Sequence, residues 1–195
     1  MASEATLHRP HPRRRLSERQ RATVGALLDA TLEVVEEVGF DQLSIRTVAG
    51  RAGVTHTTAY AYFSSKDHLV AAAFWQLLGS IPHPAANGDE PAVERVVSAL
   101  GPPAQALARR PALAQAALAA LLTGDPDVAA VRDEVGTDLF ARFRAALPAD
   151  IDPALVDTLM LVFSGAMLQA GMGYFDFDGV VTRLSAAAEQ LDLSG

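Results

Sequence analysis

Cysteine is absent from the 195-residue chain. This absence excludes disulfides, thiol nucleophiles and thiolate metal sites, and it leaves histidine and carboxylates as the candidate metal ligands. The five histidines lie at positions 8, 11, 56, 68 and 83, with no His-x3-His or His-Glu cluster among them. Because acid–base and metal catalysis need clustered polar groups, the sequence predicts that the protein is not an enzyme and uses no cofactor or metal.

Long apolar runs are scarce as well. The stretch 158–175 carries no charge over eighteen residues, which is close to the minimum span of a bilayer. It contains three glycines, and it is flanked by Asp157 and Asp176 rather than by basic residues. We therefore interpret it as a helix buried at a subunit interface and predict no membrane span. The first residues lack the apolar segment of a signal peptide, so a cytoplasmic location is expected.

Positive charge is in deficit overall, with a net charge of -7, but the two signs are segregated along the chain. Residues 1–70 carry nine basic and eight acidic side chains, whereas residues 71–195 carry seven basic and fifteen acidic ones. Six of the basic residues fall within 9–21, among them Arg13, Arg14 and Arg15. Such a run is typical of an arm that contacts nucleic-acid phosphates, and the alternative is a solvated tail that binds nothing.

Helical patterns recur throughout, and sustained strand alternation does not occur, so the sequence predicts an all-α fold of about nine helices. A capping box of Ser17 and Gln20 opens the first helix after a flexible arm of residues 1–16, and Gly39 ends it. A second capping box of Ser64 and Asp67 is expected to open the fourth helix, which runs to about residue 80. The other helices are expected at 44–52, 55–63, 91–108, 111–123, 126–147, 153–171 and 178–192.

Residues 44–63 have the features of a helix-turn-helix, in which two short helices cross closely around a tight turn. Ala49 lies four residues before Gly53, and Ala59 and Phe63 lie one turn apart, so small residues fall where the helices touch. We therefore divide the chain into the arm 1–16, a DNA-binding domain 17–64, and an effector-binding and dimerisation domain 65–195.

The segment LEVVEEVGFDQLSIRTVAGRAGVTHTTAYAYFSSKDHL, residues 32–69, resembles the TetR family of transcriptional regulators. The resemblance implies that Arg46 contacts a base, with Thr47 beside it on a phosphate, and arginine suits guanine because it bonds O6 and N7 together. It further implies base-edge contacts from His56, Thr57, Thr58 and Ala61, and phosphate contacts from Tyr60, Tyr62 and Lys66.

Simpler interpretations of these residues stay open at this point. Arg46 can form a surface ion pair with Asp41, and Tyr60 can be a core aromatic. Lys66, the only lysine, falls in the first turn of a helix, where the helix dipole gives it no benefit. A reason for Lys66 outside the folded monomer is therefore expected.

A single helix-turn-helix binds DNA weakly, so a homodimer that reads two half-sites is expected. The last two predicted helices offer more apolar surface than one small core requires, in agreement with the dimer interface that the resemblance implies. An ordinary monomer core is the alternative. The predicted interface residues are Leu159, Val162, Phe163, Ala166, Ala170, Val181, Leu184 and Ala188.

The resemblance also implies a small-molecule effector pocket in the C-terminal domain, with plain core as the alternative for each residue. The candidates are Trp75, Leu78, Gln115, Leu118, Leu121, Phe140, Phe143, Met160 and Met167, with Thr123 as a further polar group. Because few charges occur among them, an apolar effector of unknown identity is expected. The predicted function is a repressor that leaves a palindromic operator when this effector binds. Regulation without an effector, and activation rather than repression, stay open.

Overall fold

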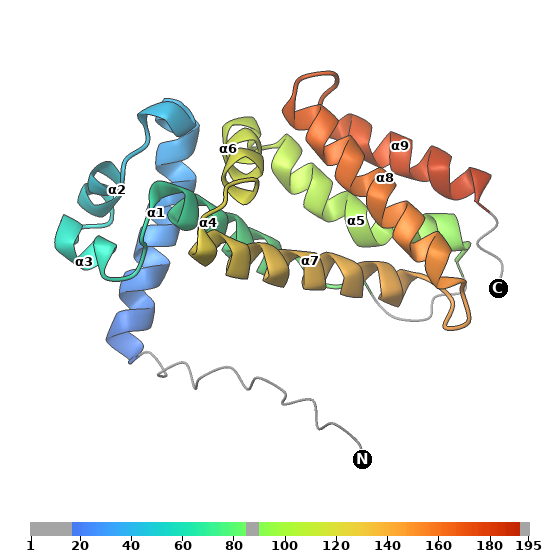
Figure 1. The fold of residues 1–195 in the computed structure, drawn as a ribbon, viewed down its shortest axis with the longest axis horizontal. Coiled ribbons are helices and arrows are strands. Elements are labelled where there is room, and N and C mark those ends of the chain that lie inside the picture. Colours follow the sequence, from blue (N-terminus) through green and yellow to red (C-terminus); the bar gives the residue numbers. More distant parts are fainter. Residues whose placement is uncertain (1–16, 85–89, 192–195) are drawn as a thin grey trace, which may run out of the picture.

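The computed structural model describes residues 17–84 and 90–191, and all regular structure in these ranges is helical. Figure 1 shows α1, α2 and α3 grouped at one end of the molecule and the remaining helices at the other, with α4 leading from one group to the other. The all-α prediction and the order of the helices are confirmed. The helices are α1 (Glu18–Gln42), α2 (Ile45–Arg51), α3 (His56–Tyr60), α4 (Lys66–Gly79), α5 (Ala92–Ala108), α6 (Pro111–Leu121), α7 (Pro126–Ala146), α8 (Pro153–Gly171) and α9 (Asp178–Gln190).

Interactions of capping residues with nearby backbone groups explain why the sequence predicts the ends of these helices. The Ser17 hydroxyl accepts from the Gln20 amide at 3.3 Å, and the Gln20 side chain accepts from the Ser17 amide at 2.8 Å, which completes the predicted capping box. Gly39 adopts a φ of 72°, so the regular part of α1 ends where the glycine was expected to end it. The side chains of Ser44, Thr55, Asp125 and Asp152 cap α2, α3, α7 and α8 in the same way, next to the starts expected for these helices.

The start of α4 differs from the prediction. Its cap is Ser65, whose hydroxyl accepts from the His68 amide at 3.0 Å, and not Ser64. The Ser64 hydroxyl instead donates to the Asp127 carboxylate at 2.6 Å, an interaction across 63 residues. A serine at either position can accept from an amide three residues ahead, so the local spacing alone does not determine which serine caps the helix.

Two apolar cores share helices α4 and α6. One core joins α1, α2 and α3 to one face of α4, with Leu69 and Val70, and to one face of α6, with Leu113 and Ala116. The other joins the rest of α4, through Phe74, to α5, α7, α8 and α9. Four buried alanines on α6 permit close approach of its neighbours, so its alanine content serves packing as well as helix propensity.

Arg142 of α7 is completely buried and holds the end of α4. Its Nε donates to Asp138 at 2.7 Å, and its Nη atoms donate to the carbonyls of Leu78, Ile81 and Pro82 at 2.8–3.3 Å. The Leu78 carbonyl lies in the last turn of α4, where a helix leaves its acceptors unpaired, and those of Ile81 and Pro82 follow the helix. Arg142 therefore fixes the position of α4 relative to α7, a role that no local pattern indicated.

Helix α8 is long and apolar enough to cross a membrane by composition alone. Its residues Leu159, Phe163 and Ala166 are buried in the core of this same chain. Packing within this chain therefore accounts for the apolar residues on the inner side of α8.

Candidate DNA interface and effector cavity

The helix-turn-helix places two sets of side chains on opposite sides of α2 and α3. We call α1, α2 and α3 the head, and the core that they share with α4 and α6 the head core. Val48 and Ala49 of α2 and Ala59 of α3 are buried in the head core, where α2 and α3 meet. Gly53 has a φ of 70° in the turn between them, a conformation that side-chain-bearing residues rarely adopt. The predicted contact between small residues is thus present, and the outer sides of both helices are left open.

The outer face carries most of the predicted DNA contacts. The exposed members are Arg46, Thr47, His56, Thr57, Tyr60 and Ala61. Tyr60 is 57% exposed, which excludes the core interpretation of this aromatic ring. Within residues 17–84 and 90–191, Arg46 makes no ion pair, so its proposed pairing with Asp41 does not occur.

Two other predicted DNA contacts are less exposed, and three lie outside the described residues. The Thr58 hydroxyl lies 2.9 Å from the Thr55 hydroxyl in the cap of α3, and Tyr62 is half-buried against the head core. Arg13, Arg14 and Arg15 lie outside the described residues. Their roles stay predictions.

Lys66 has a partner within the fold, contrary to expectation. Its Nζ donates to the carbonyl of Phe40 at 3.2 Å and lies 4.2 Å from the centre of the Phe40 ring. The carbonyl follows Gly39, where α1 is interrupted, and the ring face attracts a cation. The inference that Lys66 lacks a reason inside the monomer is therefore wrong, while its phosphate contact stays a prediction.

Arg51 fixes α2 against α1. It donates to Glu37 at 2.6 and 2.8 Å and to Glu33 at 3.1 Å. The hydrogen bond between Arg51 and Glu37 lowers the pKa of the Glu37 carboxyl and raises the pKa of the guanidinium, so both groups stay ionised near neutral pH. Sequence reasoning missed this clamp, because its members lie 14 and 18 residues apart.

A polar cluster connects the start of α4 to the corner between α6 and α7. Asp125 accepts from the Ser65 hydroxyl at 2.7 Å, and Asp127 accepts from Ser64 at 2.6 Å. His68 completes the cluster, with Nδ1 4.0 Å from Asp127 and its ring against Phe63. We call these five polar residues the α4 latch, because they hold the N-terminus of α4.

Asp125 gives the latch a dependence on pH. The hydrogen bond from Ser65 lowers the pKa of the Asp125 carboxyl, followed by the backbone amide of Asp127. A carboxyl with a lowered pKa stabilises the fold above its ordinary pKa, and this contribution is lost as the pH falls through the lowered value.

We expect Asp125→Asn to lower the melting temperature at pH 7, because the carboxylate accepts from Ser65 and Asp127 with different oxygens, whereas an amide has one oxygen and no charge. The difference from the unsubstituted protein should shrink as the pH falls below the ordinary value of about 3.9. Thermal unfolding between pH 3 and pH 7 measures both effects. Asp133→Asn, on the exposed side of α7, is the matched control. A pH-independent difference would show that ionisation of Asp125 does not strengthen the latch.

A second connection joins the head directly to α6. The Glu36 carboxylate of α1 accepts from the Leu113 amide at 2.8 Å. This amide lies in the first turn of α6, where backbone donors have no partner inside the helix. This hydrogen bond therefore connects the start of α6 directly to α1.

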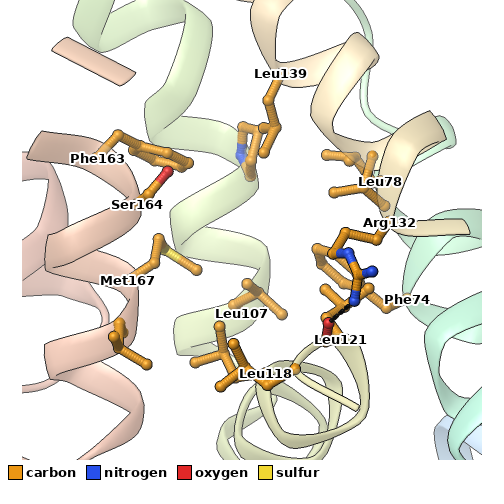
Figure 2. Close-up of a pocket in the computed structure, with 14 residues that line it drawn as sticks. Phe74, Leu78, Leu107, Leu118, Leu121, Arg132, Leu139, Phe163, Ser164 and Met167 are labelled. Atoms are coloured by element: carbon orange, nitrogen blue, oxygen red, sulfur yellow. Dashed lines mark hydrogen bonds between the residues drawn. The ribbon is translucent and has the colours of Figure 1, made fainter. Parts of the chain in front are cut away.

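An apolar cavity of about 340 Å³ lies between α4, α5, α6, α7 and α8 (Figure 2). Its volume falls within the range of about 300–1,000 Å³ that is usual for small-molecule sites. Four predicted residues line it: Leu78, Leu118, Leu121 and Met167. The others are Phe74, Pro103, Leu107, Leu122, Arg132, Val135, Leu139, Phe163, Ser164 and Leu168.

The remaining predicted lining residues lie elsewhere. Phe143 is completely buried and packs edge-on against Phe163, with ring centres 6.1 Å apart. Phe140 is 44% exposed, and Met160 packs on the core without lining the cavity. Trp75 and Gln115 line separate surface hollows. Thr123 donates its hydroxyl hydrogen to the Ala120 carbonyl and does not line the cavity.

The predicted dimer interface also needs correction. Six of its eight residues are buried by this chain alone, in the core of the C-terminal domain: Leu159, Phe163, Ala166, Ala170, Leu184 and Ala188. Val162 and Val181 are partly exposed. The prediction thus assigned the interior-facing side of α8 and α9 to the dimer interface. Both sides of α8 are apolar, so composition alone does not distinguish the inner side from the outer side. Its outer side carries Leu161, which is 74% exposed, and Met172 at 63%, with Leu168 at 36% on the edge of this side, where it also lines the cavity.

Comparison with known proteins identifies the family to which this chain belongs. Residues 27–73 match the family model described as bacterial regulatory proteins, tetR family. An uncharacterised HTH-type transcriptional regulator of Mycobacterium tuberculosis is 38% identical over 170 residues, which cover 86% of this chain and 79% of that protein. The chain belongs to the TetR family. As a member of that family of transcriptional regulators it is not an enzyme.

Other TetR family proteins agree with this assignment. The HTH-type transcriptional repressor KstR of Mycolicibacterium smegmatis is 33% identical over 135 residues, 67% of this chain and 66% of that protein. The crystal structure of a TetR transcriptional regulator from Rhodococcus sp. RHA1 superposes with a TM-score of 0.73 at 24% identity. That superposition covers 91% of this chain and 100% of the other. The whole fold is thus that of the TetR family, including the C-terminal helices that carry no local motif.

Proposed function

We propose that this TetR family regulator is a homodimeric repressor that releases a palindromic operator when a small, largely apolar molecule enters the cavity. One observation carries the proposal: a single chain joins an exposed helix-turn-helix face to an apolar cavity through α4. Residues 17–64 would bind DNA, and residues 65–195 would bind the effector and the second subunit. A cytoplasmic location is part of the proposal, because that is where a bacterial operator lies.

The route from cavity to DNA is supported by contacts along α4. Phe74 and Leu78 line the cavity, and the α4 latch and Lys66 hold the other end of the same helix. A ligand that favours a different position of α4 would therefore bias the position of the head. Such couplings typically amount to about 1–3 kcal/mol.

Selection of bound duplexes from a random pool tests the DNA-binding part. An inverted repeat is the expected result, because a twofold dimer reads two equivalent half-sites. Recovery of no enriched sequence would contradict the proposal. Release of the selected duplex by apolar metabolites then tests the effector. Tight binding that no small molecule affects would favour a regulator controlled by abundance or by a protein partner.

We expect Arg46→Ala to weaken operator binding by about 1–3 kcal/mol and to relax preference at one base pair in each half-site. The exposed guanidinium has no carboxylate partner within the described chain, so its loss should leave the head folded. Titrations against the operator and a scrambled duplex measure the difference. Arg183→Ala makes the same charge change in α9, far along the chain from the head. Equal losses on both duplexes would assign Arg46 to the phosphate backbone.

The proposed dimer would use the outer side of α8. Leu161, Leu168 and Met172 lie on this side, and Tyr174, which is 77% exposed, follows the end of the helix. Exposed apolar residues grouped in this way are typical of a surface that meets a partner. A second copy of this chain is the occupant that a twofold operator requires.

A further inference from the structure

A single charged side chain lines the otherwise apolar cavity. Arg132 of α7 lies on the wall, and apart from Ser164 every other lining residue is apolar. Figure 2 shows Arg132 on the same side as Phe74 and Leu78, across the cavity from Ser164 and Met167. Since the chain has a net charge of -7, a cavity whose one charge is positive is a specific local feature.

Arg132 is held in place by backbone carbonyls. Its Nη1 donates to the carbonyl of Leu121 at 2.7 Å and to that of Thr123 at 3.2 Å. A guanidinium has five N–H donors, so these two bonds leave others free. Among the residues that the structure describes, no carboxylate forms an ion pair with Arg132. Its positive charge thus lies at the cavity without a fixed counter-ion.

We propose that the effector is an amphipathic acid, whose apolar chain or ring system fills the cavity and whose carboxylate binds Arg132. This inference rests on the proposed effector function of the cavity and specifies its ligand class. Arg132 is exposed to solvent whereas Leu107 and Phe163 are buried, so the cavity wall runs from a charged mouth to an apolar interior. An amphiphile bound in this direction keeps its head group near water and its tail away from water.

Acids differ from neutral ligands of the same shape in the free-energy cost of leaving water. Moving a carboxylate out of water is far more costly than moving a hydroxyl, unless a cation compensates for the lost hydration. A purely apolar cavity therefore favours an alcohol over the acid of equal length. Preference for the acid requires a positive group at the binding site, and Arg132 is the one that lines this cavity. Arginine also matches the two oxygens of a carboxylate.

The same guanidinium connects the ligand to the α4 latch. The carbonyls of Leu121 and Thr123 that it holds lie just before Asp125 in the corner between α6 and α7. A carboxylate competes with these carbonyls for the donors of Arg132. Binding of the acid therefore acts on the segment that carries Asp125 and Asp127, the two acceptors that hold Ser65 and Ser64.

Calorimetric titration with dodecanoate, dodecanol and dodecyltrimethylammonium, each below its micellar concentration, tests the inference on the full-length protein. Dodecanoate should bind at least about tenfold more tightly than dodecanol, and the cationic amphiphile should bind most weakly. Arg132→Gln should remove the preference for dodecanoate and leave dodecanol affinity within about threefold. Arg109→Gln, at the end of α5 and outside the cavity lining, removes the same charge and should change neither affinity.

Each outcome bears on a different part of the account. Equal or tighter binding of dodecanol to the unsubstituted protein would overturn the acid preference, while the apolar effector cavity of the proposed function would stand. A preference that survives in Arg132→Gln would show that another group binds the carboxylate. Binding of none of the three probes would overturn both this inference and the effector part of the proposed function, without affecting operator selection. If Arg132→Gln unfolds, the comparison of probes on the unsubstituted protein, and Arg132→Lys with partial preference, decide the question.

Discussion

Arg142→Met is expected to lower the free energy of unfolding by about 3–5 kcal/mol, because removing one partner of a buried ion pair leaves groups without compensation. The substitution removes the Arg142 donors from the carbonyls of Leu78, Ile81 and Pro82, and it leaves Asp138 with His83 alone. For a chain of this size the corresponding fall in melting temperature is on the order of 10 °C.

Arg144→Met is the matched control for this expectation. Arg144 lies two residues further along α7 and donates only to the Ala149 carbonyl at 3.3 Å, in an exposed position. Surface substitutions of this kind usually change stability by no more than about 0.5 kcal/mol. Denaturant unfolding of both variants provides the comparison. Similar losses in the two would show that the buried arginine contributes no more than a surface one.

Leu161→Glu is expected to convert the proposed dimer into a monomer and to reduce operator affinity by roughly a hundredfold or more, which corresponds to about 2.7 kcal/mol. A twofold interface contains the substitution twice, and each copy places an unpaired charge in apolar surroundings. Leu161 is 74% exposed in the single chain, so the fold of each subunit should not depend on it. Light scattering after size-exclusion chromatography measures the oligomeric state.

A second exposed leucine supplies the control for the dimer. Leu122, at the end of α6, is 71% exposed and lies outside α8. Leu122→Glu makes the same chemical change, and it should leave the dimer intact. Dissociation of both variants would place the interface on α6 as well. A stable dimer with Leu161→Glu would exclude the outer side of α8.

The helix boundaries were predictable because their causes are local. Ser17, Gly39 and Asp152 act on backbone groups within a few residues, so spacing alone determines what they do. The start of α4 shows where this reasoning stops. Ser64 and Ser65 satisfy the same local rule, and each also donates to an aspartate some sixty residues away, which the local spacing does not indicate.

The cavity was predictable only in part, for a geometric reason. Helical spacing showed that α7 has apolar residues, but it did not show which of them face the core and which face the cavity. Val135 and Leu139 line the cavity, whereas Phe143, one turn further on, is enclosed by the core. Arg132 and Arg142 were not predicted because they donate to backbone carbonyls of other segments. Backbone carbonyls occur along the whole chain, so the sequence does not indicate which of them an arginine binds.

The division of α4 and α6 between two cores makes the head and the sensing region one thermodynamic unit. Leu113 and Ala116 point into the head core while Ala114 and Ala117 of the same helix belong to the other. An isolated fragment of residues 17–64 would lack the side of the head core that α4 and α6 form. The apolar side chains of Leu27 and Val48 would then be exposed to solvent. A DNA-binding head that is transferred to another such protein by a junction in a loop would lose its packing partners, unless α4 and α6 are transferred with it.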